Sequence, residues 1–169
     1  EKPLFDLLNL DPFGSMFDFV HYDSMDERGI DVALLYDKKS VQILNSETLT
    51  FIFEIPDNNP ENYDTTRDVL YVKISFKEQI INVFVVHLPS KRENDVNQPK
   101  RNFILKELKK KVQEVVQNKV ESVIILGDFN TNPDDDDITD LLNVNENEKL
   151  VNPFLNLYQK DLFSTYHYA

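Results

Sequence analysis

The chain has 169 residues, of which 41% are hydrophobic and none is cysteine, and its formal net charge is −12. A chain of this length and composition can bury a sizeable core and favours one globular domain over residues 1–169. The absence of cysteine excludes disulfide frameworks and Cys-ligated metal sites, and the negative charge disfavours a general nucleic-acid coat, because such coats contact phosphate through Lys and Arg.

The first third of the chain predicts one short helix and then several strands. A proline near the start and leucines on one face predict a helix over Pro3–Leu10. Polar residues at Asn45–Glu47 predict a turn between two of the strands. Alternating apolar residues predict strands over Phe17–Tyr22, Asp31–Tyr36, Val41–Leu44 and Leu49–Ile55.

The middle of the chain contains the clearest hairpin and the clearest helix. Apolar alternation over Val69–Phe76 and Gln79–Leu88 predicts two antiparallel strands, and the two residues between them leave room only for a tight turn. Apolar residues at helical spacing, with lysines on the opposite face, predict a helix over Pro99–Asn118.

A further strand is predicted over Ser122–Leu126, directly after this helix. Its continuous, β-branched-rich apolar run suits a strand that is buried on both faces, and Gly127 ends it. Because strands outnumber helices and several are consecutive, the sequence predicts a largely antiparallel or mixed sheet covered by helices. A last short helix is predicted over Ile138–Leu142.

The segment Gly127-Asp128-Phe129-Asn130 follows this strand and contains two polar side chains. If the backbone stays extended, Asp128 and Asn130 point to the same side, because strand side chains alternate with period two. They would then emerge at the carboxyl end of a core strand, where open α/β sheets place their chemistry. The alternative is an ordinary strand end with an Asx-type turn, and these residues alone leave both interpretations open.

His87 ends the second strand of the hairpin, immediately before Leu88-Pro89-Ser90. A single histidine at a strand end is more often structural or exposed than catalytic. If the strands before and after the long helix are parallel, however, His87 and Asp128 lie on the same edge of the sheet. A His beside an Asp/Asn pair resembles a metal-assisted hydrolytic site.

Two arginines lie in polar segments close to strands. Arg28 belongs to Asp26–Asp31, and Arg67 belongs to Thr65–Asp68. Each guanidinium could form a rigid fork for a phosphate. The alternative is a surface salt bridge of little energetic weight, which for Arg28 would be made with Asp26 or Asp23.

Other acidic residues and histidines we interpret as structural. The run Asp134–Asp137 lacks the alternating ligand spacing and the distal Glu of an EF-hand loop. It more simply places negative charge at the start of a helix, where it complements the helix dipole. His21 and His167 lie among aromatic residues, and we interpret them as packed or exposed and not as metal ligands.

Four segments together resemble the endonuclease/exonuclease/phosphatase superfamily, also called deoxyribonuclease-I-like. They read Arg-Gly-Ile-Asp-Val-Ala-Leu-Leu-Tyr (28–36), Thr-Arg-Asp (66–68), His-Leu-Pro-Ser (87–90) and Gly-Asp-Phe-Asn (127–130). Residues 23–34 match bacterial members that carry Asp-Ser-x-Asp-Glu-Arg-Gly-Ile-Asp-Val-Ala-Leu, and the resemblance covers essentially the whole chain. It implies a four-layer α/β sandwich of two mixed β-sheets flanked by helices, and hydrolysis of phosphate esters assisted by Mg²⁺ or Mn²⁺.

The resemblance also implies roles for individual residues. Asp128 would orient or deprotonate the attacking water and hold the metal, and Asn130 would contact the scissile phosphate beside the metal. His87 would bind a non-bridging phosphate oxygen and stabilise the charge that develops there. The implied substrate-binding residues are Arg67, Arg28 and Ser90.

The chain departs from the family pattern at both ends. The family's first metal ligand is a Glu in a Gln-Glu motif, which would precede Glu1, and its last motif is Ser-Asp-His, which would follow Ala169. His167 lies upstream of that motif and does not take its role. We therefore expect an internal piece of a longer enzyme, without outer strands at both ends, and little or no activity from the 169-residue chain alone.

The function that these motifs predict is a divalent-metal-dependent phosphodiesterase or endonuclease acting on DNA or RNA. The motifs equally fit a phosphatase or a sphingomyelinase-like phosphodiesterase on a small or lipid phosphate, and a non-catalytic interaction module of the same fold remains an alternative. We expect a monomer. No run of about 18 apolar residues predicts a membrane span, and the compartment stays open because the sequence begins with Glu1 and not with Met.

Overall fold

The structure, a computed structural model, describes residues 2–54, 63–91, 94–117 and 120–160. The chain divides into two compact units, the first formed by residues 1–89 and 115–129, the second by residues 90–114 and 130–169. The single domain over residues 1–169 stays a prediction.

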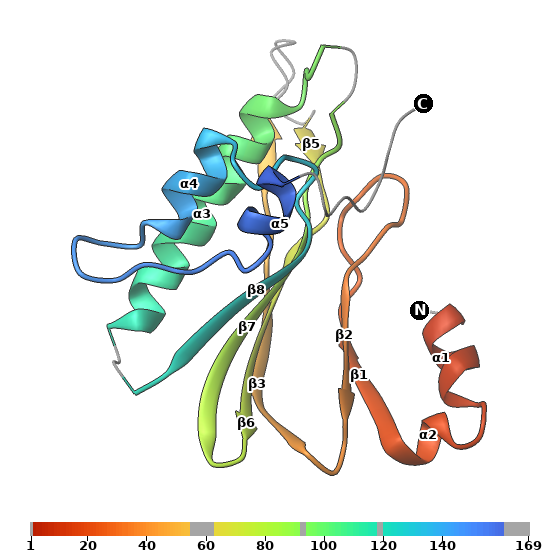
Figure 1. Cartoon of the computed structure of the whole chain (residues 1–169). Helices are drawn as coiled ribbons and strands as arrows, with labels where there is room; N and C mark the ends of the chain where they lie inside the picture. Colours follow the sequence, from red (N-terminus) through yellow and green to blue (C-terminus); the bar gives the residue numbers. More distant parts are fainter. Residues whose placement is uncertain (1, 55–62, 92–93, 118–119, 161–169) are drawn as a thin grey trace. The chain divides into compact units, whose positions relative to one another are not determined.

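Within the residues that the structure describes, the first unit contains two short helices and all of the strands (Figure 1). Its helices are α1 (Lys2–Leu8) and α2 (Phe13–Met16). Its strands are β1 (Phe17–His21), β2 (Ala33–Asp37), β3 (Val41–Leu49), β4 (Ile52–Glu54), β5 (Tyr63–Thr65), β6 (Val69–Phe76), β7 (Gln79–His87) and β8 (Ser122–Asp128).

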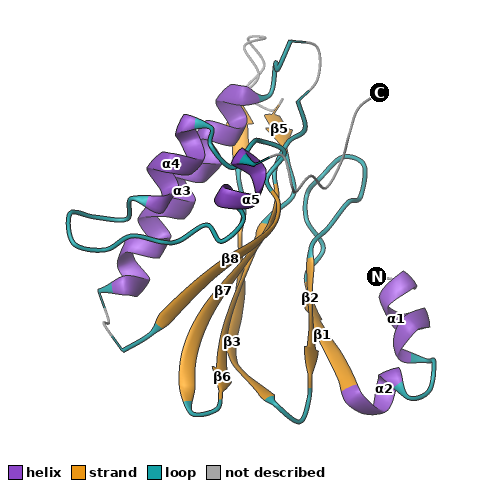
Figure 2. Ribbon diagram, in the orientation of Figure 1, coloured by secondary structure: helices purple, strands orange, loops and turns teal. Residues whose placement is uncertain are grey.

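The largest sheet of this unit has four strands in the order β3-β6-β7-β8 (Figure 2). The first three are antiparallel neighbours, whereas β7 and β8 run parallel. The turn between β6 and β7 contains only Lys77 and Glu78, with φ of 48° and 67°, as a two-residue hairpin with primed turn geometry requires. The predicted hairpin, the predicted mixed sheet and the α/β class are therefore confirmed.

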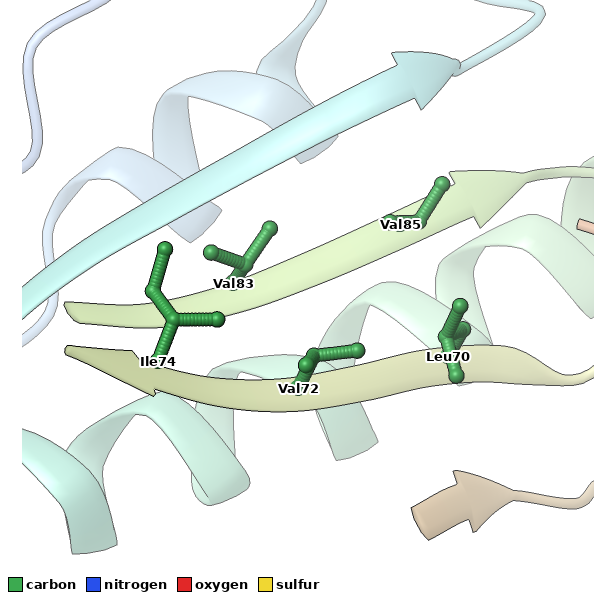
Figure 3. Close-up of a cluster of buried hydrophobic side chains, with 5 residues drawn as sticks. All are labelled: Leu70, Val72, Ile74, Val83 and Val85. Carbon is green, nitrogen blue, oxygen red and sulfur yellow. The ribbon is translucent and has the colours of Figure 1, made fainter. Parts of the chain in front are cut away.

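The core of the unit lies between this sheet and the β1–β2 hairpin. The five side chains drawn in Figure 3 occupy alternate positions of β6 and β7, so they share one face of the sheet. Val20 of β1 and Leu34, which face each other across the hairpin, pack against that cluster. On the opposite face of β1, the Phe19 ring meets Phe5 of α1 edge-on, with centroids 5.3 Å apart. The unit is thus layered as helix, two-stranded sheet and four-stranded sheet.

The structure contradicts the predicted turn at Asn45–Glu47. These three residues lie inside β3 and pair with β6, Ser46 opposite Val72, after a register shift between Ile43 and Asn45. An antiparallel sheet can have one solvated face, so Asn45 and Glu47 are exposed while their backbone stays paired with β6. This register shift explains the break in apolar alternation, from which two separate strands were predicted.

The prediction that β8 is buried on both faces is also wrong. It is the last strand in the order of the described sheet, and its Ile124 and Leu126 side chains are 44% and 40% exposed. Nor does Gly127 end the strand, which continues to Asp128. Gly127 has a φ of 131°, and a Cβ there would lie 1.9 Å from the Val86 carbonyl oxygen, so only glycine allows this close approach to β7.

The second unit holds the long helix α3 (Gln98–Val116, the last two residues of which belong to the first unit), α4 (Asp136–Leu142) and α5 (Leu155–Gln159). Lys109 Nζ of α3 is 2.8 Å from Asp140 Oδ1 of α4, so the two helices are joined side by side. Both predicted helices are confirmed, although the predicted residue 118 lies outside the described residues. Among the described residues, none of the helices has the length and apolarity needed to cross a membrane.

Candidate active site

His87 and Asp128 face each other at the carboxyl ends of the two parallel strands. They are register partners, and His87 Nε2 lies 3.9 Å from Asp128 Oδ2. The pairing continues past the strand end, because the Leu88 N–H donates to the Asp128 carbonyl oxygen at 2.8 Å. Their side chains are 31% and 61% exposed, so both are accessible to a solute. The prediction that they share one sheet edge is confirmed, and their catalytic roles stay predictions.

The start of β6 brings two more polar residues to this edge. Leu70 pairs with Val85, so Asp68, two residues before Leu70, falls across from His87, two residues after Val85. Asp68 is buried, and its Oδ2 accepts a hydrogen bond from the Thr50 hydroxyl at 3.0 Å. Its Oδ1 has no hydrogen-bond partner among the described residues. Burial raises the pKa of the Asp68 carboxyl above its usual value.

Arg67 precedes Asp68 and is also buried. Its Nε lies 3.5 Å from Asp26 Oδ1, and the two side chains are 5% and 6% exposed. Arg28 was predicted to form a salt bridge with Asp26 as one alternative, but the contact between them is made by the Arg28 backbone. Asp26 accepts a hydrogen bond from the Arg28 backbone N–H at 3.2 Å, and the Arg28 side chain is exposed.

Asn130 and Ser90 belong to the second unit. Asn130 has a φ of 48°, so the extended backbone that would align its side chain with Asp128 is not present. Asn is one of the few residues that adopt this left-handed conformation readily. Ser90 accepts a hydrogen bond at its carbonyl oxygen from Asn97 Nδ2, at 2.9 Å.

Asp135 anchors the segment that follows Asn130. It accepts hydrogen bonds from the Thr131 hydroxyl and the Asn132 N–H, and its Oδ2 lies 3.1 Å from Lys91 Nζ. Burial raises the pKa of Asp135, but these donors outweigh burial and leave that pKa below its usual value. Asp135 is therefore more than helix-terminal charge, because its carboxylate organises the preceding loop and the residue after Ser90.

Asp26 and Asp68 were not assigned a part in the candidate site from the sequence, nor was Asp135 assigned a part in the loop after Asn130. Asp68 lies in the Thr-Arg-Asp segment, in which only Arg67 was predicted to have a role. Asp26 was considered only as a partner of Arg28, and Asp135 only as charge at a helix start, because their partners Arg67 and Lys91 lie 41 and 44 residues away.

Oxygen donors suited to Mg²⁺ or Mn²⁺ are available at the predicted positions. The exposed Asp128 carboxylate and the Asn130 amide are hard oxygen ligands of the kind these ions prefer. Among the described residues, one group of three side chains could also hold a metal ion, namely His21, Asp23 and Asp31, whose ligand atoms lie within 4.8 Å of one another. His21 was predicted to be packed or exposed and not a metal ligand; its side chain is buried, with Nε2 3.4 Å from Asp31 Oδ2, and its exclusion as a ligand stays a prediction. His167 lies outside the described residues.

Comparison with known proteins gives one family. A model described as the Endonuclease/Exonuclease/phosphatase family matches residues 2–169. A search of curated proteins gave no match.

Solved structures show the same fold. A Danio rerio TDP2 structure complexed with single-strand DNA product is 20% identical, with a TM-score of 0.52, over 76% of this chain and 44% of that one. An endonuclease/exonuclease/phosphatase family protein from Bacteroides thetaiotaomicron is 18% identical, with a TM-score of 0.59, over 83% and 49%. The human Nocturnin catalytic domain with bound sulfate is 16% identical, with a TM-score of 0.51, over 78% and 51%. The match spans about half the length of these three chains.

Proposed function

Because this chain belongs to the endonuclease/exonuclease/phosphatase family, we propose that it forms the centre of a divalent-metal-dependent hydrolase of phosphate esters. The observation that carries the proposal is the register pairing of His87 with Asp128 at an exposed sheet edge. An imidazole and a carboxylate at this separation can act on the same phosphoryl group from different sides of the reacting centre.

Each residue has a defined part in the proposed reaction. The Asp128 carboxylate accepts a proton from the attacking water or orients it, and its exposed position gives the water access. The His87 N–H donates to a non-bridging phosphoryl oxygen, which gains charge as the transition state forms. Asn130 donates its amide N–H to the same phosphate. A Mg²⁺ or Mn²⁺ ion held by the Asp128 carboxylate would supply Lewis-acid polarisation of the phosphoryl group.

We infer that the first substrate class to test is a nucleic-acid phosphodiester. The support is a fold shared with a TDP2 structure that contains single-strand DNA product. The net charge of −12 fits a metal-assisted site better than a broad cationic one, because a bound cation supplies the positive field locally. Small and lipid phosphate esters are the other classes that the same chemistry can cleave. We propose a monomer as the working form.

Turnover by the full-length protein tests the proposal. The substrates are single-stranded DNA, plasmid DNA, RNA and bis-p-nitrophenyl phosphate, each with Mg²⁺, with Mn²⁺ and with excess EDTA. We expect metal-dependent cleavage that Asp128→Asn lowers by about 10²–10⁴-fold, the range for loss of a positioned acid or base. Asp134→Asn, an exposed carboxylate outside the site, is the matched control and should retain activity. Equal turnover by Asp128→Asn and the control would overturn the proposed centre.

A further inference from the structure

Residues 24–30, here called the arginine loop, form a turn built around one carboxylate. Asp26 Oδ2 accepts hydrogen bonds from the backbone N–H groups of Arg28 and Ile30, both at 3.2 Å. The Gly29 N–H donates to the Asp26 carbonyl oxygen at 2.9 Å, and Gly29 has a φ of 64°. The backbone of the loop is therefore held from inside by Asp26, while the Arg28 side chain is exposed.

Two contacts attach this loop to the chain that enters β6. The second oxygen of Asp26, Oδ1, lies 3.5 Å from Arg67 Nε, and both side chains are almost fully buried. The Thr65 hydroxyl donates to the Met25 carbonyl oxygen. Removing one partner of a buried ion pair leaves the other charge without compensation, so loss of the Asp26 carboxylate should destabilise the attached loop.

The attachment point lies at the candidate active site. Arg67 is followed by Asp68, which falls across from His87 in the β6–β7 register, and His87 faces Asp128 in the β7–β8 register. The arginine loop is thus fixed to the same sheet edge that presents the two proposed reacting side chains. Arg28 is the exposed guanidinium of this loop, whereas that of Arg67 is buried against Asp26.

We propose that Asp26 is a positioning residue: clamped by Arg67, it orders the arginine loop so that Arg28 contacts the substrate phosphate. The two arginines then have different roles, Arg28 binding substrate and Arg67 holding Asp26. The inference rests on the proposed function for its substrate contact, but the clamp itself is a property of the fold.

Limited trypsin digestion tests the clamp without any activity measurement. Trypsin cleaves after Arg28 only when the loop opens, so the cleavage rate reports the population of the open loop. We expect Asp26→Asn to raise cleavage at Arg28 about tenfold, the factor for loss of one charge-assisted contact. Glu27→Gln, an exposed neighbour in the same loop, is the matched control and should leave the rate unchanged. Equal cleavage rates for the two variants would overturn the clamp.

A double-mutant cycle in the full-length protein tests the substrate contact. We expect Arg28→Ala and Asp26→Asn each to raise KM about tenfold with kcat largely kept, because both lose the same phosphate contact. The double variant should be no worse than Arg28→Ala, since Asp26 acts through Arg28. A KM raised by the product of the two single effects would overturn the positioning role.

Two further measurements separate the possible failures. If Asp26→Asn does not fold, Thr65→Val removes only the second attachment and should give a smaller increase in cleavage at Arg28. If the unsubstituted protein turns over no phosphate ester, the proposed function fails, while the trypsin comparison still decides whether Asp26 holds the loop.

Discussion

Asp128 is the direct register partner of His87 across the parallel β7–β8 pair, and the two side chains approach to 3.9 Å between His87 Nε2 and Asp128 Oδ2. Hydrogen-bonded neighbours in a parallel sheet point to the same face. Both side chains therefore continue the face formed by Val83 and Val85, where the apolar core ends and solvent begins. A phosphate placed against this edge meets both side chains at once.

Replacing His87 should affect chemistry more than binding. We expect His87→Gln in the full-length protein to lower kcat about 10²–10³-fold, the range for loss of one donor to a developing anion, with a smaller change in KM. Because His87 and Asp128 act on one phosphoryl group, the double variant with Asp128→Asn should fall little below the worse single variant. Steady-state kinetics of the four proteins measures this, and simple multiplication of the two effects would contradict a shared centre.

Gly127 should be irreplaceable for the β7–β8 pairing. A Cβ at this position would collide with the Val86 carbonyl at 1.9 Å, and the φ of 131° strains any other residue. We expect Gly127→Ala to lower the free energy of unfolding by about 3 kcal/mol or more.

Gly29→Ala is the control, because Gly29 also has a positive φ of 64° but a Cβ there meets nothing within 4 Å. We expect Gly29→Ala to lower the free energy of unfolding by only about 1 kcal/mol, the cost of a left-handed backbone conformation alone. Urea unfolding followed by circular dichroism compares the two variants. Similar losses would show that the contact with Val86 is not the cause.

The buried carboxyl of Asp68 should make stability fall as pH rises. Burial raises the pKa of Asp68 in the folded protein, so over the window between its unfolded and folded pKa the folded state binds more protons. Stability from this group is thus fully present below the unfolded pKa and is lost as pH rises through the folded pKa. We expect Asp68→Asn to raise the free energy of unfolding at pH 7 by about 1 kcal/mol, and the gain to vanish in acid.

For Asp135 we expect the opposite pH dependence of the free energy of unfolding. The pKa of its carboxyl is lowered in the folded protein, despite burial, by hydrogen bonds from Thr131, Asn132 and Lys91. Its contribution is therefore present above the unfolded pKa and is lost as pH falls through the folded pKa. Asp135→Asn should reduce stability at pH 7 and have less effect in acid. Parallel pH profiles for the two variants would refute this assignment.

Glu121 should contribute far more to stability than a carboxylate in an exposed pair. Its two oxygens accept hydrogen bonds from Lys73 Nζ at 2.7 Å and from the fully buried Asn82 at 2.9 Å. Tyr71 donates to the same Asn82 side chain at 2.6 Å. We expect Glu121→Ala to lower the free energy of unfolding by about 1–3 kcal/mol, because the buried Asn82 amide nitrogen loses its shorter hydrogen bond and keeps only the one to the Ser122 carbonyl oxygen, at 3.3 Å.

Glu107 is the control for this network, since it pairs with Lys110 one helical turn away on an exposed face of α3. Glu107→Ala should lower the free energy of unfolding by about 0.5 kcal/mol or less. Equal losses for the two glutamates in thermal unfolding would argue against a special role for the buried network.

The local elements and the main pair of the candidate site can be predicted from the amino-acid sequence alone. The β6–β7 hairpin, helix α3 and strand β8 follow from apolar periodicity, which depends on near neighbours. A strand–helix–strand connection between His87 and Asp128 brings both residues to one edge when the strands are parallel, so this pairing was also predictable.

The other residues at that edge, and the contacts that hold them, depend on the three-dimensional fold. Asp26 pairs with Arg67 across 41 residues, and the position of Asp68 opposite His87 depends on the β6–β7 register at the sheet end. The continuity of β3 and the exposure of β8 likewise depend on their places in the sheet order. These features come from pairing between distant segments, and burial, ion pairing and strand exposure are set by those partners and not by the local sequence.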